Sequence, residues 1–172
     1  VGKVGPDEQP GHAHADSLSF EASIDQYKFI VNSGISTYEE TDLRHFQRST
    51  AAHSTLEYNK INSSEVWKSF RVARRANVKI LKYQNSKSKK IIKALHDGYS
   101  RIVESGLFHT RTIKLNKKLI EIYDEIKIKN GEAIVRYYLH PLINYIGNNT
   151  FKLPSGKKIK MINKNKLKIK KT

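Results

Sequence analysis

Short runs of β-branched and aromatic residues, each closed by residues that favour turns, recur along the whole sequence. Several alternate apolar and polar side chains, as in TIKL at 112–115 and KIKMI at 158–162, which is the pattern of strands with one buried face. The Asn130-Gly131 pair favours a tight hairpin, because both central positions of such a turn need positive φ. Many short strands at this spacing indicate an all-β fold, and we predict an antiparallel β-sandwich. The predicted strands cover residues 18–22, 27–31, 55–58, 70–74, 78–83, 90–95, 99–103, 109–115, 119–123, 134–140 and 158–162.

The segment at 37–53 (TYEETDLRHFQRSTAAH) interrupts this alternation. We expect it to form a long loop with a helical turn near residues 39–46. Long loops on a sheet scaffold often carry functional side chains. This segment is therefore a candidate part of a functional site.

The length of 172 residues suits a single domain, and the absence of Cys excludes disulfides and thiolate metal ligands. No apolar run approaches the roughly 20 residues that a membrane-spanning helix needs. The chain opens with VGKVGPDEQP and has no charged-then-apolar leader, so we expect no signal peptide in this chain. We interpret it as a fragment or a mature product.

The formal net charge of +16 is unevenly distributed. Residues 1–60 hold nine acidic and five basic side chains, whereas residues 61–172 hold seven acidic and 27 basic ones. We predict that residues 147–172 form Lys-rich C-terminal strands or a tail. Such a surface attracts polyanions, whether acidic polysaccharide, nucleic acid or anionic membrane. The alternation of Lys with Ile and Leu is equally typical of ordinary solvated strand faces.

Three polar residues, His12, His14 and Asp16, are spaced by two with only Ala between them. In an extended segment they would lie on one face, where they could bind a metal ion or an anion. His53, just before a predicted strand, could complete a site of neutral imidazole and carboxylate ligands with His14. The alternative is a pair of His side chains that hydrogen-bond a loop.

Four motifs in this order resemble the C-terminal sheet domain of the heparinase II/III-like polysaccharide lyases. They are GHAHADSLSFEASI, FIVNSGISTYE, FQRSTAAHSTLEYN and NSSEVWKSFRVARRA. The later HDGYSRI, HTRTIKL and YYLHPLI extend the resemblance to about residues 5–146, so we take 1–146 as the family domain. The resemblance implies a supersandwich-like sheet domain that follows a helical toroid in the full-length protein, and this sequence has no segment that reads as the toroid.

The resemblance also implies roles for single residues. His12 would face the cleft and position or neutralise the uronate carboxylate, while Arg48 and Arg71 would bind substrate. The implied zinc ligands are His14, Asn32 and His53, a thiolate-free set that suits zinc. The family has Asp at the position of Asn32. The neutral amide of Asn32 would bind a metal ion less tightly than a carboxylate, and Asp16 is the alternative third ligand.

Such lyases cleave uronic-acid-containing polysaccharides, of heparan or alginate type, by β-elimination. In the family a Tyr of the helical domain takes part in proton transfer. Of the residues available here, no motif nominates Tyr27, Tyr38, Tyr58 or Tyr99 for that role. We therefore expect a lyase domain that is incomplete as this chain, with zinc and an acidic polysaccharide as its ligands and a periplasmic or secreted location. The alternatives are a non-catalytic polysaccharide-binding module and a nucleic-acid binder, the latter supported by charge alone.

Overall fold

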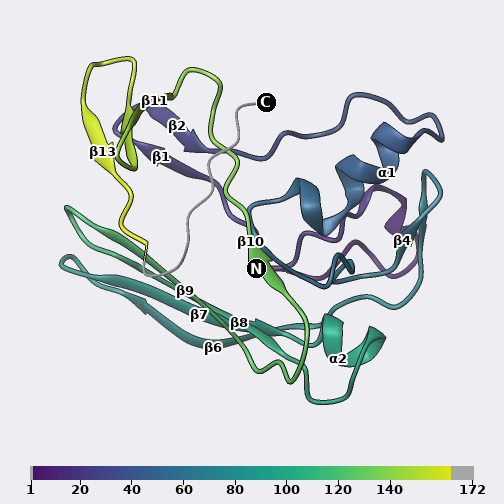
Figure 1. The fold of residues 1–172 in the computed structure, drawn as a ribbon. Helices are drawn as coiled ribbons and strands as arrows, with labels where there is room; N and C mark the ends of the chain where they lie inside the picture. Colours follow the sequence, from purple (N-terminus) through teal and green to yellow (C-terminus); the bar gives the residue numbers. More distant parts are fainter. Residues whose placement is uncertain (1, 164–172) are drawn as a thin grey trace.

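The computed structural model describes residues 2–163 and consists mainly of short antiparallel strands (Figure 1). Every strand pair within this range is antiparallel, which confirms the predicted all-β antiparallel fold. The strands are β1 (Ala22–Ile24), β2 (Tyr27–Ile30), β3 (Leu56–Tyr58), β4 (Val66–Trp67), β5 (Arg71–Val72), β6 (Val78–Asn85), β7 (Lys90–His96), β8 (His109–Leu115), β9 (Ile120–Ile126), β10 (Ala133–Val135), β11 (Asn144–Gly147), β12 (Thr150–Lys152) and β13 (Lys158–Lys160). The helices are η1 (Pro10–His12), α1 (Asp42–Arg48), η2 (Thr50–Ala52) and α2 (Gly98–Ile102).

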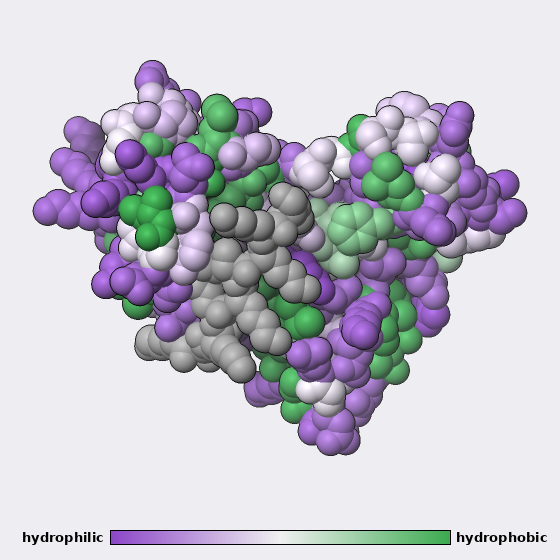
Figure 2. Space-filling view, turned by 45° about the horizontal axis from the view of Figure 1, so that its top comes forward, coloured by the Kyte–Doolittle hydropathy of each residue, from purple (hydrophilic) through white to green (hydrophobic). Residues whose placement is uncertain are grey.

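One layer is the four-stranded sheet β6-β7-β8-β9, which forms the lower part of Figure 1. Its long alternating strands are the ones that the sequence pattern predicts best. Smaller sheets, β1-β2 and β11-β12-β13, lie above one end of this layer, and α1 with β4-β5 lies above the other (Figure 1). Figure 2 shows the surface indented between these two upper parts, with hydrophilic side chains over much of the visible face.

Two clusters of buried apolar side chains form the core of the described part. The first joins β2 to β12 through Phe29, Ile30, Phe151 and Leu153. The second packs Leu56, Tyr58, Tyr99 and Leu107 between β3, α2 and the loop before β8. Burying each of these large side chains stabilises the fold by roughly 1.5–3 kcal/mol.

The expected division of the chain at residue 146 falls inside β11 (Asn144–Gly147). The strands that follow it pack Phe151 and Leu153 against Phe29 of β2. Of the predicted Lys-rich C-terminal strands, β13 (Lys158–Lys160) lies in the described range. The part of that prediction covering residues 164–172 lies outside the described residues.

Two sequence predictions are wrong in detail. The strand predicted at 99–103 is helix α2, in which the fully buried Tyr99 donates its hydroxyl to the Leu56 carbonyl oxygen at 2.7 Å. The predicted Asn130-Gly131 hairpin does not form, because β10 pairs with β3 rather than with the preceding β9. Gly131 does have positive φ, and its backbone lies against the side chain of Asn59, whose Oδ1 accepts from the Glu132 N–H. A tertiary contact therefore determines this turn.

A buried polar chain crosses the four-stranded sheet. The Gly98 N–H donates to Nδ1 of His96 at 3.1 Å, and Nε2 of His96 lies 3.1 Å from Nδ1 of His109. Nε2 of His109 in turn lies 2.6 Å from Oδ1 of Asp124. Because Nδ1 of His96 accepts a hydrogen bond, the ring proton of His96 is on Nε2. His96 then donates to His109, and His109 donates to Asp124. Both rings are neutral in this arrangement, and burial lowers the pKa of His96 to about 3 and lowers the pKa of His109.

Arg111 connects this chain to the upper layer. Its Nε and Nη2 donate to the two oxygens of Asp124 at 2.7 and 3.0 Å. Its Nη1 donates to the backbone carbonyls of Leu18 and Ser54, which belong to the segments that carry the candidate histidines. The sheet therefore fixes the position of the loops above it.

Candidate functional site

The His12–Asp16 segment is not the extended strand that the alternation suggests. Pro10–His12 form a short 3-10 helix, η1, and the backbone becomes extended only at Ala13. Ala15 is fully buried, its N–H donates to the Arg48 carbonyl at 2.9 Å, and its own carbonyl accepts from the Thr50 hydroxyl at 2.7 Å. The segment is thus fixed by the core, and His12 and His14 contact different groups.

His12 is exposed and lies against two aromatic rings. The His12 ring packs edge-on against Tyr38 and Phe70, with centroid distances of 5.6 and 6.1 Å. Tyr38 and Phe70 stack almost parallel at 5.9 Å, and both remain about half exposed. The His12 imidazole therefore stands at the surface beside two half-exposed aromatic side chains.

Arg44 of α1 lies beneath this aromatic pair. Its guanidinium carbon is 5.2 Å from the Tyr38 centroid and 5.5 Å from the Phe70 centroid, within the range of a cation–π contact. Nε and Nη2 donate to the Ser69 carbonyl, whereas Nη1 has no hydrogen-bond partner. The side chain is fully buried, and no carboxylate among residues 2–163 pairs with it. A buried cation without a counter-charge is costly and projects a positive potential on its surroundings.

The two arginines nominated by the sequence occupy different positions. Arg48 is buried, and its guanidinium donates to the carbonyls of Ala13, Lys68 and Arg71. Arg71 is exposed on β5, next to Phe70. Arg48 therefore holds the His12 segment and contributes charge from below, while the Arg71 side chain is open to solvent.

His14 and His53 form a close pair. Nδ1 of His14 lies 3.2 Å from Nε2 of His53, whose side chain is 1% exposed. Burial lowers the pKa of both rings to about 4, with the neighbouring His53 adding to the effect on His14. Both imidazoles are consequently neutral at neutral pH, the form in which His binds a metal ion.

The two nitrogen atoms are within hydrogen-bonding distance of each other, and their separation is also compatible with two ligands of one zinc ion. Ligand nitrogens at 2.0–2.1 Å from a tetrahedral zinc lie about 3.3 Å from each other, close to the separation observed here. Nδ1 of His53 lacks a well-formed hydrogen bond, although the backbone of Gln47 lies near enough to raise the pKa of the ring.

The third expected ligand, Asn32, is exposed, and its Oδ1 accepts from the Gly34 N–H at 2.9 Å. Asp16 is close enough to His14 for the two side chains to influence each other's pKa. Burial raises the pKa of Asp16, and His14 partly opposes that rise. Within residues 2–163, no three His, Asp or Glu side chains are grouped in a metal-binding arrangement. The residues present therefore offer one close pair of neutral imidazoles, with Asp16 as the acidic side chain beside them.

Sequence reasoning did not single out Arg44 or Phe70, and no motif nominated Tyr38. A signal for Arg44 exists in its spacing of four from Arg48, which places both on one face of α1. That both arginines point inward could not be read from the sequence, since exposed arginine is far more common.

The chain belongs to the heparinase II/III-like C-terminal family, whose sequence pattern it matches over residues 1–167. Among solved structures, it is similar to a mutant of the heparan sulfate lyase HepC from Pedobacter heparinus, with 20% sequence identity and a TM-score of 0.67. That alignment covers 90% of this chain and 24% of the HepC chain. HepC without the mutation aligns with 21% identity and a TM-score of 0.62, over 81% of this chain and 21% of HepC.

These two likenesses establish a shared fold, and the chain spans about a quarter of the HepC length. A search among curated proteins gives no match. In the part of the chain that the structure describes, no helix is both long and apolar enough to cross a membrane.

Proposed function

We propose that this chain is the sheet domain of a polysaccharide lyase that cleaves a uronic-acid-containing polysaccharide, of the heparan or alginate type, by β-elimination. The observation that carries the proposal is the exposed His12 imidazole beside the Tyr38–Phe70 pair, with the uncompensated Arg44 cation buried beneath. Membership of the heparinase II/III-like family and the heparan sulfate lyase activity named for HepC support the choice of substrate class.

β-Elimination from a uronate requires three events. The substrate carboxylate must be neutralised so that the C5 proton becomes acidic, a base must remove that proton, and an acid must protonate the leaving oxygen. In our proposal His12 contacts the carboxylate or moves one of these protons. The buried charge of Arg44 and Arg48 favours an anion at the same place. The exposed faces of Tyr38 and Phe70 give a sugar ring an apolar surface to rest on.

Zinc is part of the proposal as a resident ion held by His14 and His53, with Asn32 or Asp16 as a third ligand. Bound there, the ion would supply positive charge and would fix the segment that carries His12. The close neutral His14–His53 pair supports this assignment. The remaining proton-transfer group, a Tyr on a helical domain, would belong to a longer protein or a separate chain. The proposed location is periplasmic or secreted.

The role of His12 can be tested by binding. A short uronate oligosaccharide should bind the chain, and His12→Ala should weaken binding by about tenfold or more, the equivalent of a hydrogen bond to a charged group. His45→Ala provides the matched control, because His45 is an exposed histidine on α1 with no side-chain partner in the described range. Equal affinity of the His12→Ala and wild-type chains would contradict the proposal.

The metal assignment can be tested by elemental analysis of the purified protein. His12→Ala should leave the zinc content unchanged, whereas His14→Ala and His53→Ala should each release the ion. Loss of zinc in the His12→Ala variant alone would contradict this division of roles.

A non-catalytic acidic-polysaccharide-binding module is the second candidate. It is favoured by the neutral amide of Asn32, which is hydrogen-bonded to the Gly34 N–H. The two functions differ in product formation, since elimination creates an unsaturated uronate that absorbs in the ultraviolet. Binding without any rise in absorbance, also after a helical domain is supplied, would identify the module.

A further inference from the structure

The far end of the four-stranded sheet carries a dense group of lysines. Residues 78–96 contain six Lys and no Asp or Glu. The turns that join β6 to β7 and β8 to β9, together with the first residue of β7, contribute five lysines, which we call the lysine hairpin surface: Lys87, Lys89, Lys90, Lys117 and Lys118. Because Lys90 pairs with Leu115, both turns lie at the same end of the sheet. At about 4.8 Å between neighbouring strands, the two turns are about 10 Å apart.

These five lysines are free cations. All of them are exposed, and none forms an ion pair with a residue in the range 2–163. Two other lysines of the sheet are engaged, since Lys93 lies 3.6 Å from a Glu125 oxygen and Lys114 lies 4.6 Å from the centre of the Tyr123 ring. The positive charge of the hairpin surface is therefore not neutralised by its surroundings.

The two turns are also held in shape by their own side chains. The Ser86 hydroxyl donates to the Lys89 carbonyl at 2.8 Å, and Oδ1 of Asn116 accepts from the N–H groups of Lys118 and Leu119 at 2.9 Å. A ligand would meet lysines displayed on ordered turns, so that little backbone entropy would be lost on binding.

Lysines also occur on the outer face of the sheet, where acidic side chains accompany them. Register places Lys82 opposite Lys93, and Lys114 stands two residues from Thr112 on the same face. With Glu125 beside Lys93 and Glu121 opposite Lys114 on that face, the unpaired positive charge is concentrated in a cationic band across the two hairpin turns, which is wider than a single ionic group. An extended polyanion fits such a band better than a small anion does.

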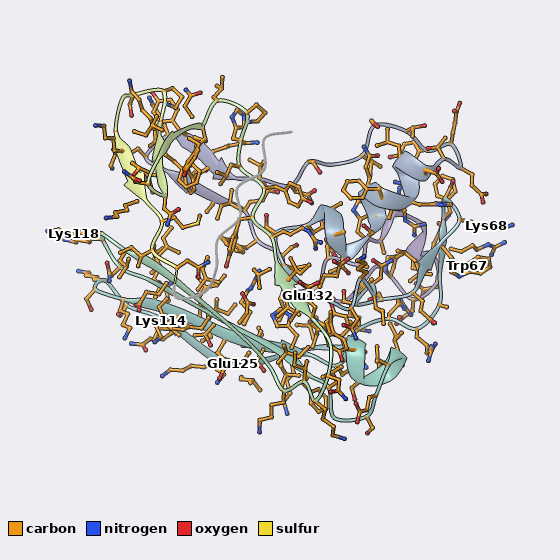
Figure 3. The ribbon with its side chains drawn as sticks, viewed as in Figure 1. Trp67, Lys68, Lys114, Lys118, Glu125 and Glu132 are labelled. Atoms are coloured by element: carbon orange, nitrogen blue, oxygen red, sulfur yellow. The ribbon has the colours of Figure 1, made fainter. Side chains whose placement is uncertain are left out.

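This band is remote from His12. Figure 3 places Lys114 and Lys118 at one end of the molecule and Trp67 and Lys68 at the other. Trp67 belongs to β4, which pairs with β5 beside Phe70, the residue in contact with His12. Along β7 alone, the distance from Lys90 to His96 is about 20 Å. Only a ligand many residues long could contact both places.

We propose that the lysine hairpin surface is a second binding site for an acidic polysaccharide, separate from the His12 site. The surface anchors a part of the polymer that lies outside the region undergoing cleavage. The identity of the polymer rests on the proposed function, whereas the charge and its location come from the structure. A nucleic-acid ligand fits less well, because Tyr83 and Tyr123 lie on opposite faces of the sheet and cannot form one stacking platform.

The test is a charge reversal of three hairpin lysines, Lys87→Glu, Lys89→Glu and Lys118→Glu. The matched control reverses three exposed lysines elsewhere that also lack ion pairs in the described part: Lys28→Glu, Lys60→Glu and Lys152→Glu. Both variants have the same net charge, so a difference between them reports location. The probe is heparan sulfate polymer, with affinity measured over a range of salt concentrations.

The hairpin variant should lose about tenfold or more in affinity. The slope of log affinity against log salt concentration should also become shallower by about two to three, because each of the three lost lysines accounts for about one released counterion. The control should change by less than about threefold, because its lysines lie outside the band. Equal losses in the two variants, or unchanged binding in the hairpin variant, would overturn the proposal. The choice of ligand would be overturned if duplex DNA displaces the polymer from the wild-type chain and the hairpin variant no longer binds that DNA.

The two proposals can fail independently. If His12→Ala weakens the short oligosaccharide while the hairpin variant binds polymer like the wild type, the second site is refuted and the proposed function stands. If the hairpin variant loses the polymer while His12→Ala has no effect on the oligosaccharide, the second site is supported and the assignment of His12 is refuted.

Discussion

Replacing Asp124 with Asn should destabilise the fold more than any other isosteric change in the described sheet. Asp124 accepts from His109 at 2.6 Å and from two guanidinium nitrogens of Arg111 at 2.7 and 3.0 Å. Burial by itself would raise the pKa of Asp124, but these hydrogen bonds and the Arg111 charge lower it overall. The carboxylate is therefore ionised at neutral pH and compensates an Arg111 side chain that is almost fully buried.

Asp124→Asn would leave the buried Arg111 charge without compensation. Removing one partner of a buried ion pair costs about 3–5 kcal/mol, and the remaining amide oxygen places this change near the lower value. An unfolding entropy of about 2.1 cal/mol/K per residue gives roughly 0.36 kcal/mol/K for this chain length, so Tm should fall by about 8 °C. Differential scanning calorimetry at pH 7 would measure the change.

Glu125→Gln is the matched control, since Glu125 is adjacent but faces solvent and pairs with Lys93 at 3.6 Å. An exposed pair of this kind contributes less than about 1 kcal/mol, so Tm should change by less than about 3 °C. If Asp124→Asn also lowered Tm by less than about 3 °C, the argument that the carboxylate compensates a buried charge would be refuted.

Two further predictions concern the same part of the fold. The pKa of His96 is about 3 in the folded chain, well below its value in the unfolded chain. Because the unfolded chain then binds a proton more readily than the folded chain, the free energy of unfolding should decrease as pH falls below about 6.5. In urea titrations from pH 7 to 4, His96→Gln should reduce the pH slope by up to about 1.4 kcal/mol per pH unit, and an unchanged slope would contradict the assignment. Gly98→Ala would place a Cβ 2.0 Å from the Ser63 carbonyl oxygen, so the free energy of unfolding, measured by chemical denaturation, should fall by about 3 kcal/mol. The control Gly2→Ala should change it by almost nothing, because a Cβ at Gly2 meets open space. Equal stabilities of the two variants would refute the steric argument.

The strands of the large sheet could be predicted from the sequence because each has enough residues for alternation to be visible. The prediction of 109–115 coincides with β8, and 90–95 falls one residue short of β7. The strand predicted at 99–103 failed because a segment as short as Tyr99–Val103 is compatible with either a helix or a strand. Packing against Leu56 decides in favour of the helix, and such a distant contact leaves no local trace in the sequence.

The candidate site, like the fold, could be predicted only in part from the sequence. The sequence grouped His14 with His53, and the structure places Nδ1 of His14 3.2 Å from Nε2 of His53. The direction in which Arg44 and Arg48 point could not be predicted. Their burial depends on carbonyl groups of Ser69, Ala13, Lys68 and Arg71, which come together only when the loops are folded.

The carbonyl of Ala15 accepts from both the Thr50 and Ser63 hydroxyls, and the Ala13 carbonyl accepts from Arg48. Because these bonds hold the backbone on both sides of His14, the segment has no separate folding transition of its own. Its Ala15 amide should exchange with deuterium as slowly as amides in the centre of the large sheet. A ligand that reaches His12 would then encounter a surface already in its final shape, and a calorimetric titration would record association with little entropy lost to ordering of the chain.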